Sequence, residues 1–133
     1  MAPQSSPRPV GNGRKAPRQR INIKRIYEPP ARGDGYRVLV DRLWPRGVSK
    51  SRAALDAWEK ELAPSTALRE WFGHAPRRWA GFRRRYLREL EDHKAELDAL
   101  KRRSARKFVT LLYAAKSRDY NEARVLQEAI EEI

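Results

Sequence analysis

An almost uninterrupted apolar run at residues 108–115, Phe-Val-Thr-Leu-Leu-Tyr-Ala-Ala, places the strongest constraint on the fold of this chain. A strand that is apolar at successive positions needs cover on both faces, and such burial is typical of parallel sheets packed between helices. A second run at residues 36–43, rich in Val and Leu, predicts another central strand. We therefore expect an α/β fold, a compact single-domain sandwich in which a small, mostly parallel sheet is flanked by helices.

Shorter patterns around these runs predict further strands and helices. Ile21 and Ile23 alternate with polar residues as in a half-buried strand, whereas periodicity leaves residues 55–62 open between helix and strand. Asp119 and Glu122 have the spacing of a capping box at the start of a final helix. Apolar residues at three- and four-residue spacing predict helices over residues 65–73, 76–90, 92–103 and 119–133, and residues 49–54 favour a short helix.

The length of 133 residues suits one folded domain. Residues 1–20 contain four prolines and five basic residues but no acid, so we expect a disordered basic N-terminal arm ahead of a domain spanning residues 21–133. No segment approaches the roughly 18 consecutive apolar residues that a membrane span needs, and no apolar run of the signal-peptide type follows the first residues. We expect no membrane association and a cytoplasmic location.

The residue types present exclude several kinds of chemistry. The chain has no cysteine and two histidines, which excludes disulfides, thiolate nucleophiles and zinc sites built on sulfur. No Walker loop, dinucleotide-binding glycine motif or nucleophile elbow occurs, and no cluster of His, Asp and Glu has metal-ligand spacing. We therefore predict no cofactor and no metal, and any catalysis has to use oxygen or nitrogen groups.

The charge of the chain indicates anionic partners. Its formal net charge is +13, from 30 Lys and Arg against 17 Asp and Glu, and such an excess attracts nucleic acids, nucleotides and phosphates. Codon bias in a GC-rich genome also explains the excess, because most of the basic residues are arginines. The arm, the basic face of residues 77–88 and residues 101–107 form one candidate nucleic-acid surface. Trp79, Phe82 and Tyr86 within that helix are typical of a core seam rather than of a base-stacking platform.

Candidate site residues follow the predicted central strands. In open parallel sheets, ligands bind beyond the carboxyl ends of the strands, where loops lead to helix N-termini. Arginine and lysine side chains there, together with free backbone N–H groups, would bind a phosphate or carboxylate. The residues that this rule selects as ligand-binding are Arg42, Trp44, Arg46, Gly47, Ser65, Tyr113, Lys116 and Asn121.

Asp41 and His74 are the candidate catalytic residues. Asp41 follows the second central strand and would act as a base, and His74 follows a glycine at a helix junction. Both also have a structural interpretation, in which Asp41 pairs with Arg42 and His74 satisfies exposed carbonyl groups. In the same interpretation Trp44 covers the end of the sheet and Arg46-Gly47 turns the chain. The sequence leaves both interpretations open and does not establish whether the protein is an enzyme.

Several segments resemble one family in a single register. They are residues 36–47 (YRVLVDRLWPRG), Ala63-Pro64-Ser65, residues 68–74 (LREWFGH) and residues 110–116 (TLLYAAK). In this order they resemble the YeaO-like proteins of the family named domain of unknown function 488. The resemblance implies a common α/β fold, an extended segment within residues 55–62 and a site at the loops described above. It implies no particular reaction.

The chain departs from the patterns of that family near the candidate site. A longer branch of the family has a cysteine where this chain has Tyr113. The same branch has a Cys-His-Arg motif where this chain has Asn121, Glu122 and Ala123, so the comparison excludes a thiol mechanism here. Tyr120 stands where the YeaO-like branch commonly has a histidine, which weakens an acid–base role for this corner.

These observations predict a YeaO-like α/β domain that binds a phosphate- or carboxylate-bearing small molecule, such as a nucleotide, at the carboxyl ends of its strands. Arg42 and Arg46 would hold the anion, and Trp44 would pack over the ligand. Neutral hydrogen bonds would come from Ser65, Tyr113 and Asn121. The alternative is a nucleic-acid-binding accessory protein that uses its basic arm and arginine-rich helix face. Oligomeric state is left open.

Overall fold

A computed structural model describes residues 20–133, so the predicted arm lies outside the described residues apart from Arg20. The strands are β1 (Ile21–Arg25), β2 (Tyr36–Leu39), β3 (Ala57–Trp58) and β4 (Val109–Tyr113). The α-helices are α1 (Lys50–Ala53), α2 (Thr66–Phe72), α3 (Trp79–Leu90), α4 (Lys94–Ser104) and α5 (Glu122–Glu131). Single turns of 3-10 helix lie at Arg32–Asp34, Lys60–Leu62, Pro76–Arg78 and Glu91–His93.

The four strands form one sheet in the order β1-β4-β2-β3, and every neighbouring pair is parallel. The apolar run predicted as a central strand is β4, which pairs with β1 on one side and β2 on the other. Leu111 lies opposite Ile23 and Val38 in the two registers. All residues of β4 are buried. The α/β class and the parallel sheet are therefore confirmed.

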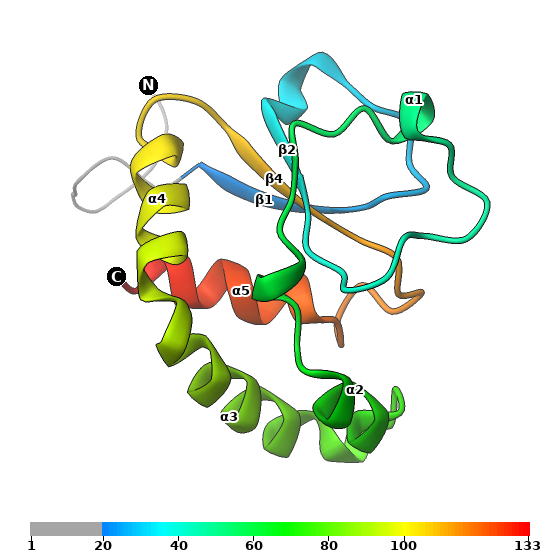
Figure 1. Ribbon diagram of the computed structural model, residues 1–133, viewed down its shortest axis with the longest axis vertical. Coiled ribbons are helices and arrows are strands. Elements are labelled where there is room, and N and C mark those ends of the chain that lie inside the picture. The colour runs from blue at the N-terminus through cyan, green and yellow to red at the C-terminus, as the bar shows by residue number, and fades with distance from the viewer. Residues whose placement is uncertain (1–19) are drawn as a thin grey trace, which may run out of the picture.

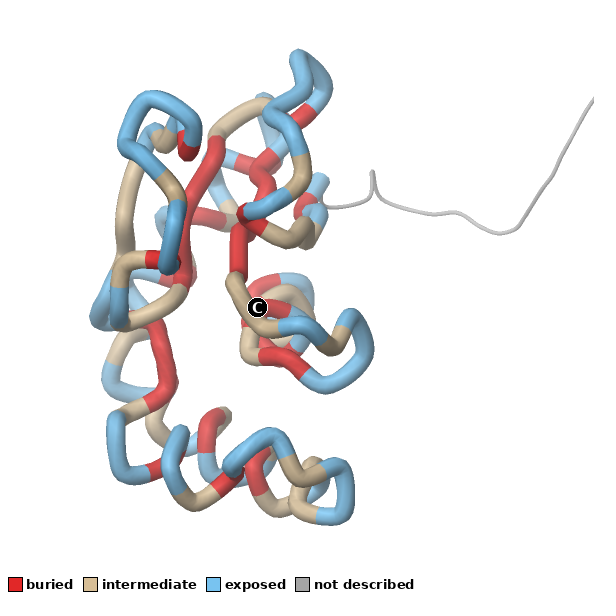
Figure 2. The backbone as a smooth tube through the Cα atoms, turned by 90° about the vertical axis from the view of Figure 1, so that its right-hand side faces the viewer, coloured by how far each residue is buried: buried red, intermediate tan, exposed pale blue. Residues whose placement is uncertain are grey.

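Helices cover the two faces of the sheet unequally (Figure 1). One face packs against α2, α3, α4 and α5, and the large core between them contains Leu111 and Tyr86. The other face is covered by α1 and the loops around it, where Leu39 and Leu112 form a smaller core with Ala53. Figure 2 shows long buried stretches along the strands, whereas buried and exposed positions alternate along the helices. This pattern matches the apolar periodicity of the sequence.

The aromatic stripe of α3 belongs to the core, as predicted. Phe82 and Tyr86 are buried, and Phe82 stacks on Phe72 of α2 with ring centroids 4.4 Å apart. The hydroxyl group of Tyr86 donates to the carbonyl oxygen of Leu62. A buried phenol with its hydroxyl satisfied in this way stabilises the packing of α3 on the sheet and is not available to stack on a base.

The start of α5 differs from the predicted capping box. The N-cap is Asn121, whose side-chain oxygen accepts the N–H of Arg124 at 3.1 Å. The backbone N–H groups of Asp119 and Tyr120 instead donate to the hydroxyl of Ser117, so the chain is still turning at the residue predicted to be the cap. Glu122 is therefore the first residue of α5, where its side chain is free to point away from the helix.

Two strands are shorter than the sequence indicated. The strand predicted over residues 36–43 ends at Leu39, and residues 55–62 contain only the two-residue β3 followed by a 3-10 turn. The backbone N–H of Val40 still donates to Leu112 at 3.0 Å, but the chain then leaves the sheet. Within residues 20–133, none of the helices combines the length and the apolar composition that crossing a bilayer requires.

Candidate functional site

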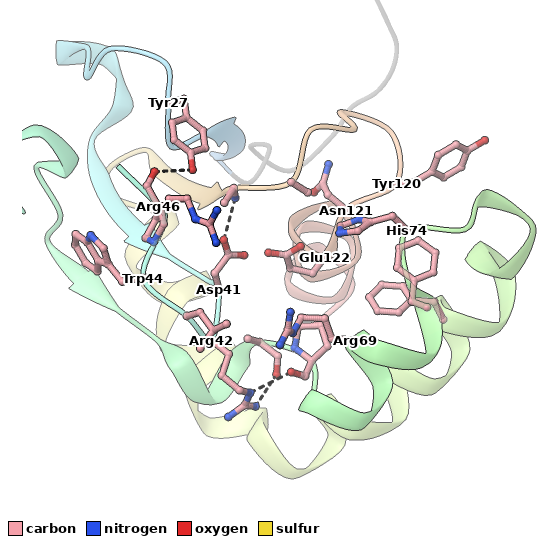
Figure 3. Close-up of a pocket in the computed structure, with 18 residues that line it drawn as sticks. Tyr27, Asp41, Arg42, Trp44, Arg46, Arg69, His74, Tyr120, Asn121 and Glu122 are labelled. Carbon is pink, nitrogen blue, oxygen red and sulfur yellow. Dashed lines mark hydrogen bonds between the residues drawn. The ribbon is translucent and has the colours of Figure 1, made fainter. Parts of the chain in front are cut away.

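A cavity of about 560 Å³ opens at the carboxyl ends of β2 and β4 (Figure 3). The loop after β2 forms one wall, and the segment before α2 together with the end of α2 forms a second wall. The third wall is the loop that leads from β4 into α5. The loops after the two central strands therefore face the same space, which is the arrangement that parallel topology predicts.

Asp41 and Glu122 form a pair of carboxyl groups inside this cavity, where their side chains point toward each other (Figure 3). Asp41 lies just after β2, and its Oδ2 accepts the backbone N–H of Ala114 at 2.9 Å. Its carbonyl oxygen accepts the indole N–H of Trp58 at 2.7 Å. Asp41 thus joins the ends of β2 and β4 and is held in one orientation toward Glu122.

The pKa of Glu122 is raised well above the ordinary range of a glutamic acid. Burial is the largest cause, and the hydrogen bond and negative charge of Asp41 act in the same direction. The backbone N–H at the start of α5 and the Arg69 guanidinium oppose these effects only in part. Part of the Glu122 surface faces the cavity, but protein surrounds its carboxyl group closely. Glu122 therefore retains its proton at pH values where an exposed glutamate is ionised.

Two arginines that line the cavity make no hydrogen bond or ion pair to another residue among 20–133, although the Arg69 charge acts on Glu122. Arg46, from the loop after β2, and Arg69, on α2, both line the cavity wall. Neither guanidinium group makes a hydrogen bond or an ion pair to another described residue, and Figure 3 shows the two side chains reaching in from different walls. A guanidinium offers five N–H donors in a planar fork that matches phosphate and carboxylate. These groups are available to an anion from outside.

Arg42 also lines the cavity, but its guanidinium is engaged with the backbone. Its Nε donates to the carbonyl oxygen of Pro64 at 3.2 Å, and one terminal nitrogen donates to that of Ala63 at 3.1 Å. These bonds tie the loop after β2 to the segment before α2. The sequence also allowed a pairing of Arg42 with Asp41, but the Arg42 guanidinium donates to these two carbonyl oxygens instead.

Aromatic and histidine side chains complete the walls. Tyr27, Phe72 and Tyr120 line the cavity together with His74, and the hydroxyl of Tyr27 donates to the carbonyl oxygen of Arg46 at 3.0 Å. His74 has a left-handed backbone with φ of 59°, a conformation in which histidine is enriched among residues other than glycine. The turn at Gly73 and His74 directs the imidazole toward Phe72, with ring centroids 6.1 Å apart.

Several of the predicted ligand-binding groups make internal bonds. Trp44 lines the cavity, but its indole N–H donates to Val48 at 2.6 Å and its ring meets Trp58 edge to face. The hydroxyl of Ser65 donates to Glu89 at 2.6 Å and accepts the N–H of Leu68. The amide of Asn121 caps α5 and donates to two carbonyl groups of the preceding loop. Trp44 and Asn121 thus shape the cavity walls, whereas Ser65 caps α2 and does not line the cavity.

Four predicted ligand residues are not among those that line the cavity: Gly47, Ser65, Tyr113 and Lys116. Gly47 has φ of 78°, which a turn after Arg46 needs. Tyr113 is buried at the end of β4, and burial raises the pKa of its phenol. Lys116 is exposed on the loop beyond β4.

Sequence reasoning did not select Glu122, Arg69 or Tyr27 as site residues. Glu122 was assigned to a capping box and Arg69 was given no role, because local spacing describes only neighbours in the chain. The signal for Glu122 was its place in the segment that aligns with a reactive motif of the family. In residues 20–133, no group of three or more His, Asp or Glu side chains is placed to hold a metal ion.

Comparison with known proteins agrees with the predicted resemblance. The model of the family DUF488-N3i, described as the inactive DUF488-N3 subclade, matches residues 20–133. The chain belongs to the DUF488 family. The uncharacterized protein YeaO of Escherichia coli K12 is 47% identical over 108 residues, which cover 81% of this chain and 94% of that relative.

Mycobacterial relatives match this DUF488 domain over nearly all of their own length. The uncharacterized protein Rv3073c of Mycobacterium tuberculosis H37Rv is 40% identical over 111 residues, which cover 84% of this chain and 93% of that relative. The uncharacterized protein Mb3100c of Mycobacterium bovis gives the same values. No solved structure matches this chain significantly. The predicted YeaO-like membership is thereby confirmed.

Proposed function

We propose that this DUF488 domain binds a small molecule bearing a phosphate or carboxylate, of nucleotide-like size, in the cavity at the carboxyl ends of β2 and β4. The observation that carries the proposal is that Arg46 and Arg69 line one cavity without a partner among the described residues. Both arginines are exposed, and two guanidinium groups that border one concave site attract a counter-charge. An anion with several oxygen acceptors would supply that counter-charge.

The size and walls of the cavity support this assignment. Its volume of about 560 Å³ lies within the range of about 300 to 1,000 Å³ that is typical of small-molecule sites. The rings of Phe72, Tyr120 and His74 offer apolar surface beside the polar groups. Such a wall suits a flat or ring-shaped body attached to the anionic group.

We further propose that the domain binds its ligand without chemical turnover. The subclade to which it belongs is described as inactive, and the chain has no cysteine to serve as a nucleophile. Asp41, the candidate base, has one oxygen engaged by a backbone N–H and faces the second carboxyl group of Glu122. In this proposal Arg46 and Arg69 bind the anion, and Arg42 holds the cavity wall.

Calorimetric titration with adenosine monophosphate, ribose 5-phosphate, inorganic phosphate and citrate tests the proposal. We expect at least one of these anions to bind, and the double variant Arg46→Ala, Arg69→Ala to weaken that binding by about a hundredfold, since each charged hydrogen bond contributes about 1.5 to 3 kcal/mol.

The matched control is the double variant Arg84→Ala, Arg88→Ala, which removes the same charge from exposed positions of α3. We expect this control to bind the anion with the affinity of the unmodified protein. If both double variants bind equally well, the cavity is not the anion site. Absence of binding for every anion in the panel would also reject the proposal.

A second candidate function is binding of nucleic acid to the outer face of α3. One observation favours it: Arg77, Arg84, Arg85 and Arg88 are exposed, and none of them makes an ion pair within residues 20–133, whereas Arg83 pairs with Glu128. The guanidinium of Arg85 also lies over the ring of Trp71, 4.2 Å from its centroid. Arg77 lies in the 3-10 turn that leads into α3, and a row of arginines without ion pairs along this turn and helix would follow a phosphate backbone.

Salt dependence distinguishes this candidate from the cavity. Binding of a short DNA duplex through α3 should weaken steeply between about 50 and about 200 mM salt, because phosphate contacts release counterions. The Arg84→Ala, Arg88→Ala variant should reduce that slope by about two, since each lost phosphate contact lowers it by about 0.9. An unchanged slope in this variant would reject the α3 surface.

A further inference from the structure

We propose that the anion bound in this cavity also carries a hydroxyl group, and that this hydroxyl bridges the carboxyl groups of Asp41 and Glu122. The ligand class is therefore a phosphorylated polyol or sugar rather than a simple phosphate or an amino phosphate. The inference rests on the proposed function, because it concerns a second contact made by the same ligand.

The geometry of the cavity places two kinds of polar group in reach of one small molecule. Arg46 and Arg69 enter the cavity from different walls (Figure 3). The carboxyl groups of Asp41, just after β2, and Glu122, at the start of α5, face each other inside the same cavity. A ligand that fills the cavity and binds both arginines therefore meets the carboxyl pair.

The chemistry of the pair selects a hydroxyl group. One Asp41 oxygen is engaged by the N–H of Ala114, so the other is the acceptor that faces Glu122. Protonated Glu122 and Asp41 hydrogen-bond to each other in this structure, and a ligand hydroxyl would insert into that bond, accepting from Glu122 and donating to Asp41. A hydroxyl group is both a donor and an acceptor, so it can receive the proton of one carboxyl group and donate to the other.

The surroundings of Glu122 disfavour a ligand ammonium group. Four groups from different elements face it: Asp41 after β2, Arg69 on α2, Tyr86 on α3 and Tyr113 on β4. Glu122 is also the first residue of α5, where the helix end carries partial positive charge. An ammonium group beside Glu122 would be repelled by that helix end and by the arginine. A neutral hydroxyl avoids this repulsion.

Three matched probes of the same chain length test the inference. Glycerol 3-phosphate carries hydroxyl groups, propyl phosphate carries none, and 3-aminopropyl phosphate carries an ammonium group. In calorimetric titrations near pH 7, we expect glycerol 3-phosphate to bind about tenfold more tightly than each of the others, as a hydrogen bond to a charged group implies. Equal affinities, or tighter binding of the amino phosphate, would overturn the hydroxyl assignment.

Variants of Glu122 show whether the carboxyl pair causes the preference. Glu122→Gln retains a donor and an acceptor and should keep the preference for glycerol 3-phosphate. Glu122→Leu has neither, so it should still bind phosphate but should bind glycerol 3-phosphate and propyl phosphate with about equal affinity. A preference that survives in Glu122→Leu, with folding checked by circular dichroism, would overturn the inference.

The pH dependence gives a second readout. The preference should decline as pH rises through the raised pKa of Glu122 in the unmodified protein, and this decline should be absent in Glu122→Gln. If all three probes bind equally and the Arg46→Ala, Arg69→Ala variant binds none of them, the anion site stands and only the hydroxyl contact fails. If no probe binds the unmodified protein, the anion site and the hydroxyl contact both fail.

Discussion

Two groups of charged residues in this domain differ in how their charges are matched. The first, which we call the Asp34 cluster, comprises Asp34, Lys24 and Arg37 on the sheet face that α1 covers. Lys24 donates to both carboxylate oxygens of Asp34 at 3.0 Å, and Arg37 donates to Asp34 and to the carbonyl oxygens of Ala53 and Ala54. Every charge in this cluster has an opposite charge or an acceptor within the protein.

The carboxyl pair at the other end of the sheet has the reverse arrangement. Asp41 faces a second carboxyl group, that of Glu122, and the nearby Arg46 and Arg69 have no partner among residues 20–133. Both regions combine carboxylates with arginines, so residue type does not distinguish them. The two regions differ in whether each charge has a partner within the protein. Charges with an internal partner contribute to stability, and charges without one beside a cavity are available for a ligand.

The largest expected effect comes from breaking the Asp34 cluster. Asp34→Ala leaves Arg37, whose side chain is 5% exposed, without its counter-charge, and removal of one partner from a buried pair costs about 3 kcal/mol or more. Urea unfolding should show this loss in the free energy of unfolding. Asp98→Ala is the control, because its pair with Arg102 is exposed and such pairs contribute less than about 1 kcal/mol. Equal losses in the two variants would contradict the comparison.

The second prediction concerns pH, where the two regions should behave oppositely. Burial raises the pKa of Asp34, but hydrogen bonds from the Ala31 N–H, Lys24 and Arg37 outweigh it and the pKa is lowered. Its contribution to stability is therefore present above the ordinary pKa of aspartic acid and is lost as pH falls through the folded value. The pKa of Glu122 is raised, so its contribution is lost as pH rises above the ordinary range of a glutamic acid.

Glu122→Gln should remove the second of these slopes. In the unmodified protein, the free energy of unfolding should fall with rising pH by up to about 1.4 kcal/mol per pH unit, the value for one proton retained on folding. The variant should show a flatter profile and greater stability at alkaline pH. Glu131→Gln, at an exposed position of α5, should leave the profile unchanged. A profile that Glu122→Gln does not alter would show that Glu122 carries no retained proton.

A smaller effect should separate a helix-capping residue from a ligand residue. Ser65 caps α2 by accepting the Leu68 N–H at 3.1 Å and also donates to Glu89. Ser65→Ala should therefore lower the free energy of unfolding by about 1 kcal/mol, without changing affinity for the anions tested above. Thr66→Ala, at the exposed first position of the same helix, should have little effect. Loss of affinity in a Ser65→Ala protein of near-normal stability would place Ser65 in contact with the ligand.

The smallest effect on stability is expected for Arg46→Ala. Among the described residues, Arg46 takes part in a hydrogen bond only through its backbone carbonyl, which accepts from Tyr27, and alanine retains this bond. The free energy of unfolding should change by no more than about 0.5 kcal/mol, while anion affinity falls. Thermal and urea unfolding measured beside calorimetry would check both values. A large loss of stability would mean that Arg46 has a structural role like that of Arg37.

The fold was predictable from the sequence wherever apolar residues are consecutive or recur at regular spacing along the chain. The uniformly apolar β4 and the stripe of Phe82, Tyr86 and Leu90 are confirmed as core, since each pattern directly reports which side chains leave water. The two-residue β3 was not predictable in its extent. Its pairing depends on bonds from Asp56 to Arg37 and from Glu59 to Leu39, which exist only after β2 is in place.

The candidate site was predictable in location and only partly in composition. Parallel topology brings the ends of β2 and β4 together, so Asp41 and Arg46 could be placed at one edge of the sheet beforehand. Glu122 and Arg69 come from helices whose orientation the local spacing does not define. The same spacing placed the cap at Asp119, although the loop bonds of Ser117 move it to Asn121.

The sequence by itself determined the chemical inventory of this protein: no thiol, an excess of positive charge, and strands apolar enough to need cover on both faces. Only the tertiary structure decided which charges meet. Asp34 and Asp41 are both aspartates beside the same strand, yet one is surrounded by cations and the other faces a carboxyl group. The reason is that charge matching depends on distances and burial between segments far apart in the chain, which folding sets and local sequence does not encode.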